Sequence, residues 1–91
     1  MLVEQLGNKN QFKVFTKNGT VFQSYSSLIA FKSNSGHVFL TGSWDKSATT
    51  LKHLKIFLNI ALTKKQIQKN IDGGVYEIVE EYKLRDLALN H

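Results

Sequence analysis

Cysteine and proline are both absent from this chain of 91 residues, and arginine occurs once, as Arg85. Without cysteine there is no disulfide framework, no thiolate metal ligand and no cysteine nucleophile. Without proline there is no proline-rich linker, and no Gly/Ser-rich stretch divides the chain. These absences, together with the length, predict a single domain over residues 1–91.

Long hydrophobic runs are missing as well. The longest apolar segment, Ile56 to Leu62, is interrupted by Asn59 and is far shorter than the roughly 20 residues that span a bilayer. The first eight residues hold neither a basic leader nor a long apolar stretch, so we expect no signal peptide. The expected protein is cytoplasmic and has no membrane partner.

The residues that are present suffice for a folded core. Apolar residues make up 42% of the chain and aromatic residues 11%, and no low-complexity segment indicates disorder. A core of this size is thin, so coverage of part of the apolar surface by a second copy or by a partner is one expected arrangement. A homo-oligomer therefore stays among the alternatives.

The net charge of +5 is unevenly distributed along the chain. Residues 1–69 contain ten lysines against two carboxylates, whereas residues 70–91 contain five carboxylates against Lys83 and Arg85. A basic body attracts phosphate backbones through long-range steering and counterion release. Because base-specific readout depends on arginine forks, lysines indicate nucleic-acid binding without strong sequence preference. The alternative is that the lysines only keep a small domain soluble.

The periodicity predicts an α+β fold: a four-stranded antiparallel meander followed by two helices on one face and a fifth C-terminal strand. Asn18-Gly19 lies between two segments rich in Phe, Val and Thr, which favours a hairpin with a type I′ turn. Such a turn pairs Phe15 with Phe22 and Thr16 with Val21. The four strands are expected over residues 11–16, 20–25, 28–32 and 37–41.

After the meander the spacing of apolar residues becomes helical. A long helix is expected from Ser47 to Leu62, with Asp45 or Ser47 as its N-cap. A second helix is indicated by the capping-box pattern Thr63-Lys64-Lys65-Gln66 and by a stop at Gly73-Gly74.

The C-terminal segment is read in two parts. Val75 to Val79 is rich in β-branched and aromatic residues and is expected to be the fifth strand. Glu80 to Leu89 fits either a short terminal helix or a frayed tail, and the sequence does not decide between them.

The start of the long helix is the first candidate site. Free backbone N–H groups there, flanked by hydroxyls and lysines, can bind a phosphate, although helix capping by Asp45 and Ser47 explains the same residues. Trp44, between the predicted sheet and helix, is expected to be buried. The expected phosphate contacts, with hydroxyls from two threonines, are Lys13, Lys46, Thr49, Thr50, Lys52, Lys55, Lys64 and Lys65.

Aromatic side chains on the predicted sheet are the second candidate. Interleaved with lysines, they would form a platform on which single-stranded bases stack. A domain this small also needs most of these rings in its core. The rings in question belong to Phe12, Phe15, Phe22, Tyr25, Phe31 and Phe39.

Nothing in the sequence indicates an enzyme. The three histidines, His37, His53 and His91, have no spacing to one another or to a carboxylate that suggests metal ligation. Neither a nucleophile elbow nor a P-loop is present. Glu80 and Glu81 are adjacent and so point apart. We therefore predict no catalytic residue, no metal and no cofactor.

One resemblance covers most of the chain. It rests on Gln11-Phe12-Lys13-Val14, Asn18 to Tyr25, Ile29-Ala30-Phe31, Trp44-Asp45, Ser47 and Thr49-Thr50. These segments resemble a set of small uncharacterised proteins encoded by bacteriophages and plasmids. Where that set tends to have a tyrosine after Trp-Asp, this chain has Lys46. The resemblance implies a mobile-element context, hence the host cytoplasm, and implies no mechanism.

The leading hypothesis from the sequence is a small accessory protein whose lysine-rich surface contacts nucleic acid. The alternative is a protein-interaction module that binds or blocks an acidic host protein, or that assembles with itself through Ile56 and Ile60. The salt dependence of binding distinguishes these two hypotheses, because binding to phosphates weakens steeply as salt is raised, whereas an apolar interface persists.

Overall fold

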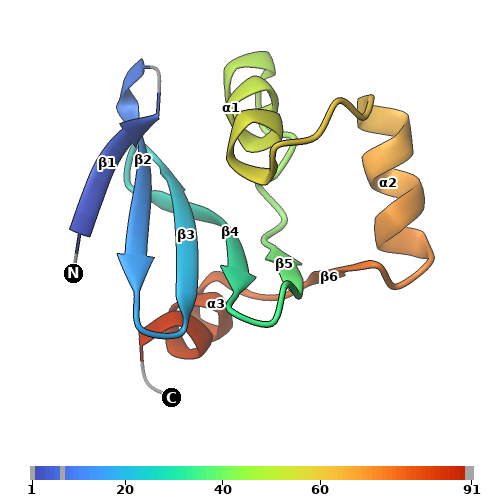
Figure 1. Cartoon of the computed structure of the whole chain (residues 1–91). Coiled ribbons are helices and arrows are strands. Elements are labelled where there is room, and N and C mark those ends of the chain that lie inside the picture. Colours follow the sequence, from blue (N-terminus) through green and yellow to red (C-terminus); the bar gives the residue numbers. More distant parts are fainter. Residues whose placement is uncertain (1, 7, 90–91) are drawn as a thin grey trace.

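A computed structural model describes residues 2–6 and 8–89 of the chain (Figure 1). Its strands lie side by side in one sheet, in their sequence order. Within residues 2–6 and 8–89 the six strands are β1 (Leu2–Leu6), β2 (Asn8–Thr16), β3 (Gly19–Ser24), β4 (Ser27–Ser33), β5 (Val38–Leu40) and β6 (Tyr76–Ile78). The three helices in the described residues are α1 (Ala48–Leu58), α2 (Lys64–Asp72) and α3 (Glu81–Leu89).

The α+β class is confirmed, and the four-stranded meander corresponds to β2 to β5, which pair antiparallel in succession. The predicted fifth strand is β6, which is shorter than expected and pairs parallel with β5. The prediction omitted β1, an additional edge strand that pairs antiparallel with β2.

The predicted register of the first hairpin is wrong. Thr16 pairs with Gly19 and Phe15 with Thr20, so the two-residue turn is Lys17-Asn18 rather than Asn18-Gly19. Two features favour this turn. The Thr16 hydroxyl accepts a hydrogen bond from the Asn18 backbone N–H (3.3 Å) and donates one to the Gly19 oxygen (3.0 Å). Gly19 also has a φ of +154°. The shift moves each partner by two residues, so every side chain keeps its predicted face.

The ends of α1 and α2 follow the capping signals in the sequence. Ser47 is the N-cap of α1 and accepts a hydrogen bond from the Thr50 N–H. α1 ends at Leu58, earlier than predicted, because Asn59 adopts a left-handed conformation (φ 56°) that stops the helix. Thr63 and Gln66 form the predicted capping box of α2 reciprocally, and Gly73 is its C-cap.

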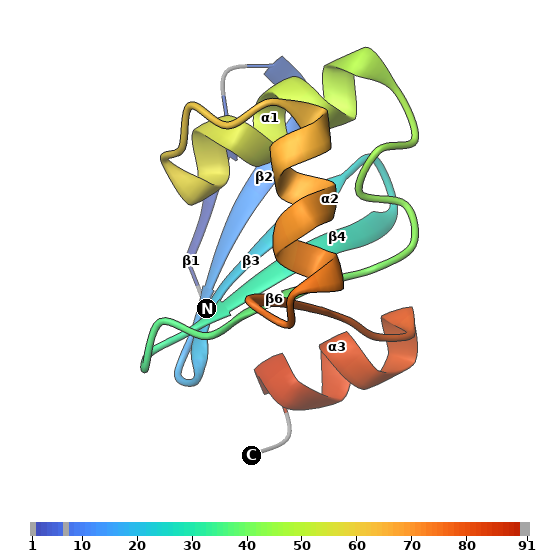
Figure 2. The same ribbon diagram turned by 90° about the vertical axis from the view of Figure 1, so that its right-hand side faces the viewer.

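Helices cover both faces of the sheet (Figure 2). α1 and α2 lie on one face, as predicted, over a core that includes Phe22, Leu40 and Trp44. The ring of Phe22 stacks on Phe57 of α1, with 5.8 Å between centroids. α3 lies on the opposite face and packs Leu84 and Ala88 against a smaller cluster. The helical alternative for residues 81–89 is therefore the observed one, and it adds a third layer.

Candidate functional site

Two of the lysines on the sheet point to the side that carries α1 and α2. Lys13 pairs directly with Phe22, and Lys32 pairs directly with Val38. Both partners belong to the core beneath α1 and α2, and directly opposite residues share a face. The Lys13 ammonium lies 5.1 Å from the centre of the Phe15 ring, a cation–π distance.

The outer surfaces of α1 and α2 carry further lysines on the same side. α1 buries Thr50, His53 and Leu54 and leaves Lys52 exposed, with Lys55 half-buried in its last turn. α2 buries Ile67, and its exposed Lys65 and Lys69 are four residues apart and so share one side of the helix. The basic face, as we define it, consists of Lys13, Lys32, Lys46, Lys52, Lys55, Lys64, Lys65 and Lys69.

Three carboxylates lie on the same side as the basic face. Glu4 pairs across strands with Lys13, and Asp72 ends α2. Asp45 is 3.5 Å from the Lys64 ammonium, so this lysine already has an ionic partner. Eight lysines against three carboxylates leave this side strongly positive among the described residues.

The opposite side of the sheet carries mostly negative charge. Glu77 pairs with Phe39, which packs against α3, and its carboxylate lies 3.6 Å from His37. Helix α3 and the residue before it add three more carboxylates. The positive charges on this helix are those of Lys83 and Arg85. The uneven distribution of charge along the sequence therefore corresponds to a difference in net charge between the two sides of the sheet.

A cavity of about 310 Å³, lined mostly by residues with polar side chains, lies at the N-terminus of α1. Lys46 and Ser47 line one side of it, and the Ser24–Ser27 turn lines the other. Thr49 is exposed on the first turn of α1, whereas Thr50 is buried. The Thr50 hydroxyl accepts a hydrogen bond from Ser47 (3.1 Å) and lies 3.5 Å from that of Ser24. Of the two predicted threonines, Thr49 is the one that faces solvent.

Tyr25 is the exposed aromatic residue beside this cavity. It adopts a left-handed conformation (φ 56°), which is uncommon for a non-glycine residue, and 62% of its surface is exposed. Its N–H donates to the Asn10 oxygen (2.7 Å) and its own oxygen accepts from the Gln23 side chain (2.7 Å). The sequence placed Tyr25 among the candidate rings without distinguishing it from the others.

The other candidate rings are not gathered on one open surface. Phe22 and Phe31 are buried, on opposite faces of the sheet, and Phe12, Phe15 and Phe39 are half-buried. Trp44 is buried, as predicted. Half of the six candidate rings, those of Phe22, Phe31 and Phe39, therefore belong to or pack against the core, and a continuous stacking platform does not form in the described residues.

The two predicted interface residues lie in different environments. Ile56 is 50% exposed on α1, whereas Ile60 packs against the core beside α1 and α2. Other large exposed apolar residues, among them Leu2 and Val3 of β1, lie elsewhere. Of the two, Ile56 is therefore the more accessible to a partner.

Among residues 2–6 and 8–89, no group of three or more His, Asp or Glu side chains is arranged to hold a metal ion. His53 is buried on α1, and its Nδ1 lies 2.8 Å from the Thr49 oxygen, which accounts for its orientation. In the same residues no helix has the length and apolar character needed to cross a membrane. His91 lies outside the described residues.

A family model described as a family of unknown function (DUF8033) matches residues 1–73, from the N-terminus to the end of α2. β6 and α3 lie beyond the matched span. No curated protein and no solved structure matches the chain.

Proposed function

We propose that this chain, which belongs to the family of unknown function DUF8033, binds nucleic acid through the phosphates, using the basic face, without strong sequence preference. The observation that carries the proposal is the direction of the lysines. Lys13 and Lys32 on the sheet, Lys52 on α1 and Lys65 on α2 all belong to the side that carries both helices. Neutralising phosphates with several lysines releases counterions, which is the main source of such affinity.

The composition of the basic face sets the kind of binding. Its cations are all lysines, which act as point charges on flexible stems rather than as planar forks. Contacts of this kind position a protein on a phosphate backbone and read no base. Exposed Lys46, Thr49 and Tyr25 near the N-terminus of α1 add a charge, a hydroxyl and a ring for one unstacked base. The mobile-element origin that the resemblance implies forms part of this proposal.

The test is fluorescence anisotropy with labelled single- and double-stranded oligonucleotides of two unrelated sequences, at salt concentrations from 50 to 200 mM. We expect similar affinities for both sequences and a logarithmic affinity that falls linearly with the logarithm of salt. Replacing Lys52 by Gln should weaken binding and reduce the salt slope by about one for duplex DNA, because one phosphate contact is lost.

The matched control is Lys83→Gln, which removes the same charge from α3 on the opposite side. If Lys83→Gln weakens binding as much as Lys52→Gln, the effect is one of net charge and the proposed face is wrong. If neither oligonucleotide binds at 50 mM salt, nucleic acid is not the partner. Binding of an acidic host protein, the alternative, then becomes the leading function.

A further inference from the structure

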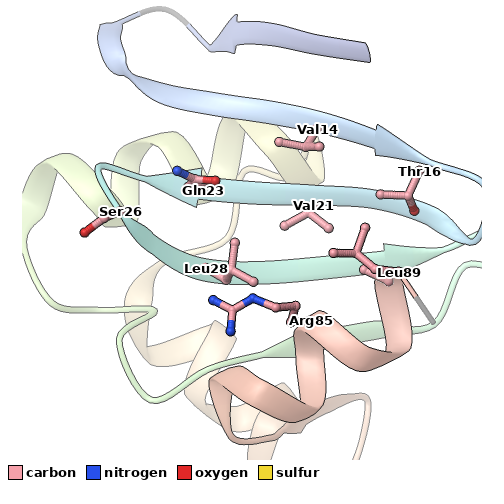
Figure 3. A pocket seen from close by; sticks show the side chains of 9 residues that line it. Val14, Thr16, Val21, Gln23, Ser26, Leu28, Arg85 and Leu89 are labelled. Carbon is pink, nitrogen blue, oxygen red and sulfur yellow. The ribbon is translucent and has the colours of Figure 1, made fainter. Parts of the chain in front are cut away.

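A groove of about 200 Å³ lies on the side of the sheet opposite the basic face, between the sheet and α3 (Figure 3). Val14, Val21 and Leu28, from three neighbouring strands, form its aliphatic floor. Arg85 and Leu89, one turn apart on α3, stand along one side. The groove therefore combines an apolar surface with one cationic side chain.

The groove exists because α3 covers only part of this face. Val3, Val14 and Val21 are directly opposite one another on β1, β2 and β3, and so form an apolar row. α3 packs against Val21 and the strands beyond it, where its Leu84 and Ala88 are buried. Val14 is only half-buried and Val3 is 54% exposed. The part of the row farthest from α3, Val14 and Val3, is therefore left at least partly uncovered.

Arg85 gives the groove its chemistry. It is the single arginine of the chain, and Figure 3 shows its guanidinium beside Leu28, at the edge of the apolar floor. Arg85 forms an ionic contact with Glu81, one turn earlier on α3, at 3.4 Å, and both side chains are substantially exposed. Exposed pairs of this kind contribute little stability. A planar guanidinium binds carboxylates with two parallel hydrogen bonds, so an incoming carboxylate can compete with Glu81.

We propose that this groove binds a small apolar carboxylate, with its hydrocarbon part on Val14, Val21 and Leu28 and its carboxylate on Arg85. The volume sets the size: an aliphatic cavity of about 150 Å³ holds benzene, and pockets for drug-sized ligands measure about 300 to 1,000 Å³. The expected ligand is therefore about as large as benzoate or hexanoate. Gln23 also lines the groove; one N–H of its amide is donated to the Tyr25 oxygen (2.7 Å), and the second can donate to the same carboxylate.

The test is an NMR titration of the full chain that follows the methyl signals of Val14, Val21 and Leu28. The probes are acetate, butyrate, hexanoate and benzoate, with hexanol and benzyl alcohol as uncharged counterparts. We expect saturable shifts for hexanoate and benzoate, with affinity rising about fourfold per methylene from acetate to hexanoate. The alcohols should bind about tenfold more weakly than the matching acids, because they lose the charged hydrogen bonds to Arg85.

Three variants test whether the carboxylate of the ligand binds to Arg85. Arg85→Gln should weaken hexanoate binding about tenfold, and Lys83→Gln, which removes the same charge outside the groove, should change it less than twofold. Glu81→Gln should strengthen binding, because it removes the competing carboxylate. Equal binding of hexanol and hexanoate, or equal effects of the two charge-removing variants, would overturn the role of Arg85.

Absence of saturable methyl shifts for any probe at millimolar concentration would overturn the site altogether. The outcome does not depend on the proposed function, because the groove and the basic face lie on opposite sides of the sheet. Shifts that depend on protein concentration and not on the probe would instead identify a second copy of the chain as the occupant.

Discussion

The Asn18 side chain, in the turn between β2 and β3, donates hydrogen bonds to the backbone oxygens of Leu87 (3.1 Å) and Ala88 (3.2 Å) at the end of α3. The last carbonyls of a helix lack partners within the helix, and here a residue about 70 positions earlier satisfies two of them. This contact joins the turn of the first hairpin to the C-terminal helix. Together with the burial of Leu84 and Ala88, it holds the segment after β6 as a docked helix.

The first prediction concerns this contact. Replacing Asn18 by Ala should lower the free energy of unfolding by about 1 to 2 kcal/mol, because two carbonyls lose their donor. Asn18→Asp should be at least as destabilising, since a carboxylate cannot donate and is unfavourable at a helix C-terminus. Urea denaturation measures both. The exposed neighbour Lys17→Ala is the control, and an equal loss in that variant would contradict the role given to Asn18.

The second prediction concerns the close packing of the same turn against β4. At Gly19, with its φ of +154°, an added Cβ would collide with the Lys32 backbone oxygen and approach the Phe31 ring to 2.9 Å. Gly19→Ala should therefore cost about 2 kcal/mol or more in unfolding free energy. Gly42→Ala, where a Cβ meets nothing within 4 Å, is the matched control and should change stability by less than about 0.5 kcal/mol. Similar midpoints for the two variants in urea would refute the steric argument.

The hairpin shows where local sequence signals stop being sufficient. Asn18-Gly19 is the strongest two-residue turn signal in the chain, and it predicted the right hairpin in the wrong register. The signal assumes that both residues take positive φ, whereas of the two only Gly19 does so. Non-local contacts decide the register. In the observed register the Asn18 amide reaches the end of α3, and Gly19 lies where β4 leaves no room for a Cβ.

Elements that depend on local signals were predicted best. The capping box of α2 and the stop at Gly73 require only neighbouring residues, and both are observed. β1 was missed because its residues are largely exposed, so its strand conformation depends on pairing with β2 rather than on a buried stripe. The groove beside Arg85 could not be predicted either, since it requires knowing how far α3 extends across the sheet.

The third prediction concerns Gln11, which the sequence did not single out. Its side chain is fully buried on β2, and its amide oxygen and nitrogen have no hydrogen-bond partner within the described part of the chain. A buried amide without partners carries its full desolvation penalty, which an apolar residue of similar shape avoids. Gln11→Met should therefore raise the free energy of unfolding by about 1 kcal/mol.

Thermal and urea unfolding check this prediction against Gln23→Met. The Gln23 amide donates a hydrogen bond to the Tyr25 oxygen (2.7 Å), so that variant should be neutral or destabilising. A loss of stability in Gln11→Met larger than that in Gln23→Met would mean that the Gln11 amide has a role that the packing alone does not reveal.

The fourth prediction separates two neighbouring lysines of the basic face. Lys64 is held 3.5 Å from Asp45, whereas Lys65, the next residue, is exposed on the outer side of α2. A lysine that must leave a carboxylate to reach a phosphate contributes less binding free energy than one that need not. In the anisotropy assay, Lys65→Gln should therefore weaken oligonucleotide binding more than Lys64→Gln. Asp45→Asn should strengthen binding, because it releases Lys64 and removes a negative charge from the face. Unchanged affinity in Asp45→Asn, together with equal losses in the two lysine variants, would mean that the Asp45–Lys64 contact has no influence on how this face meets a polyanion.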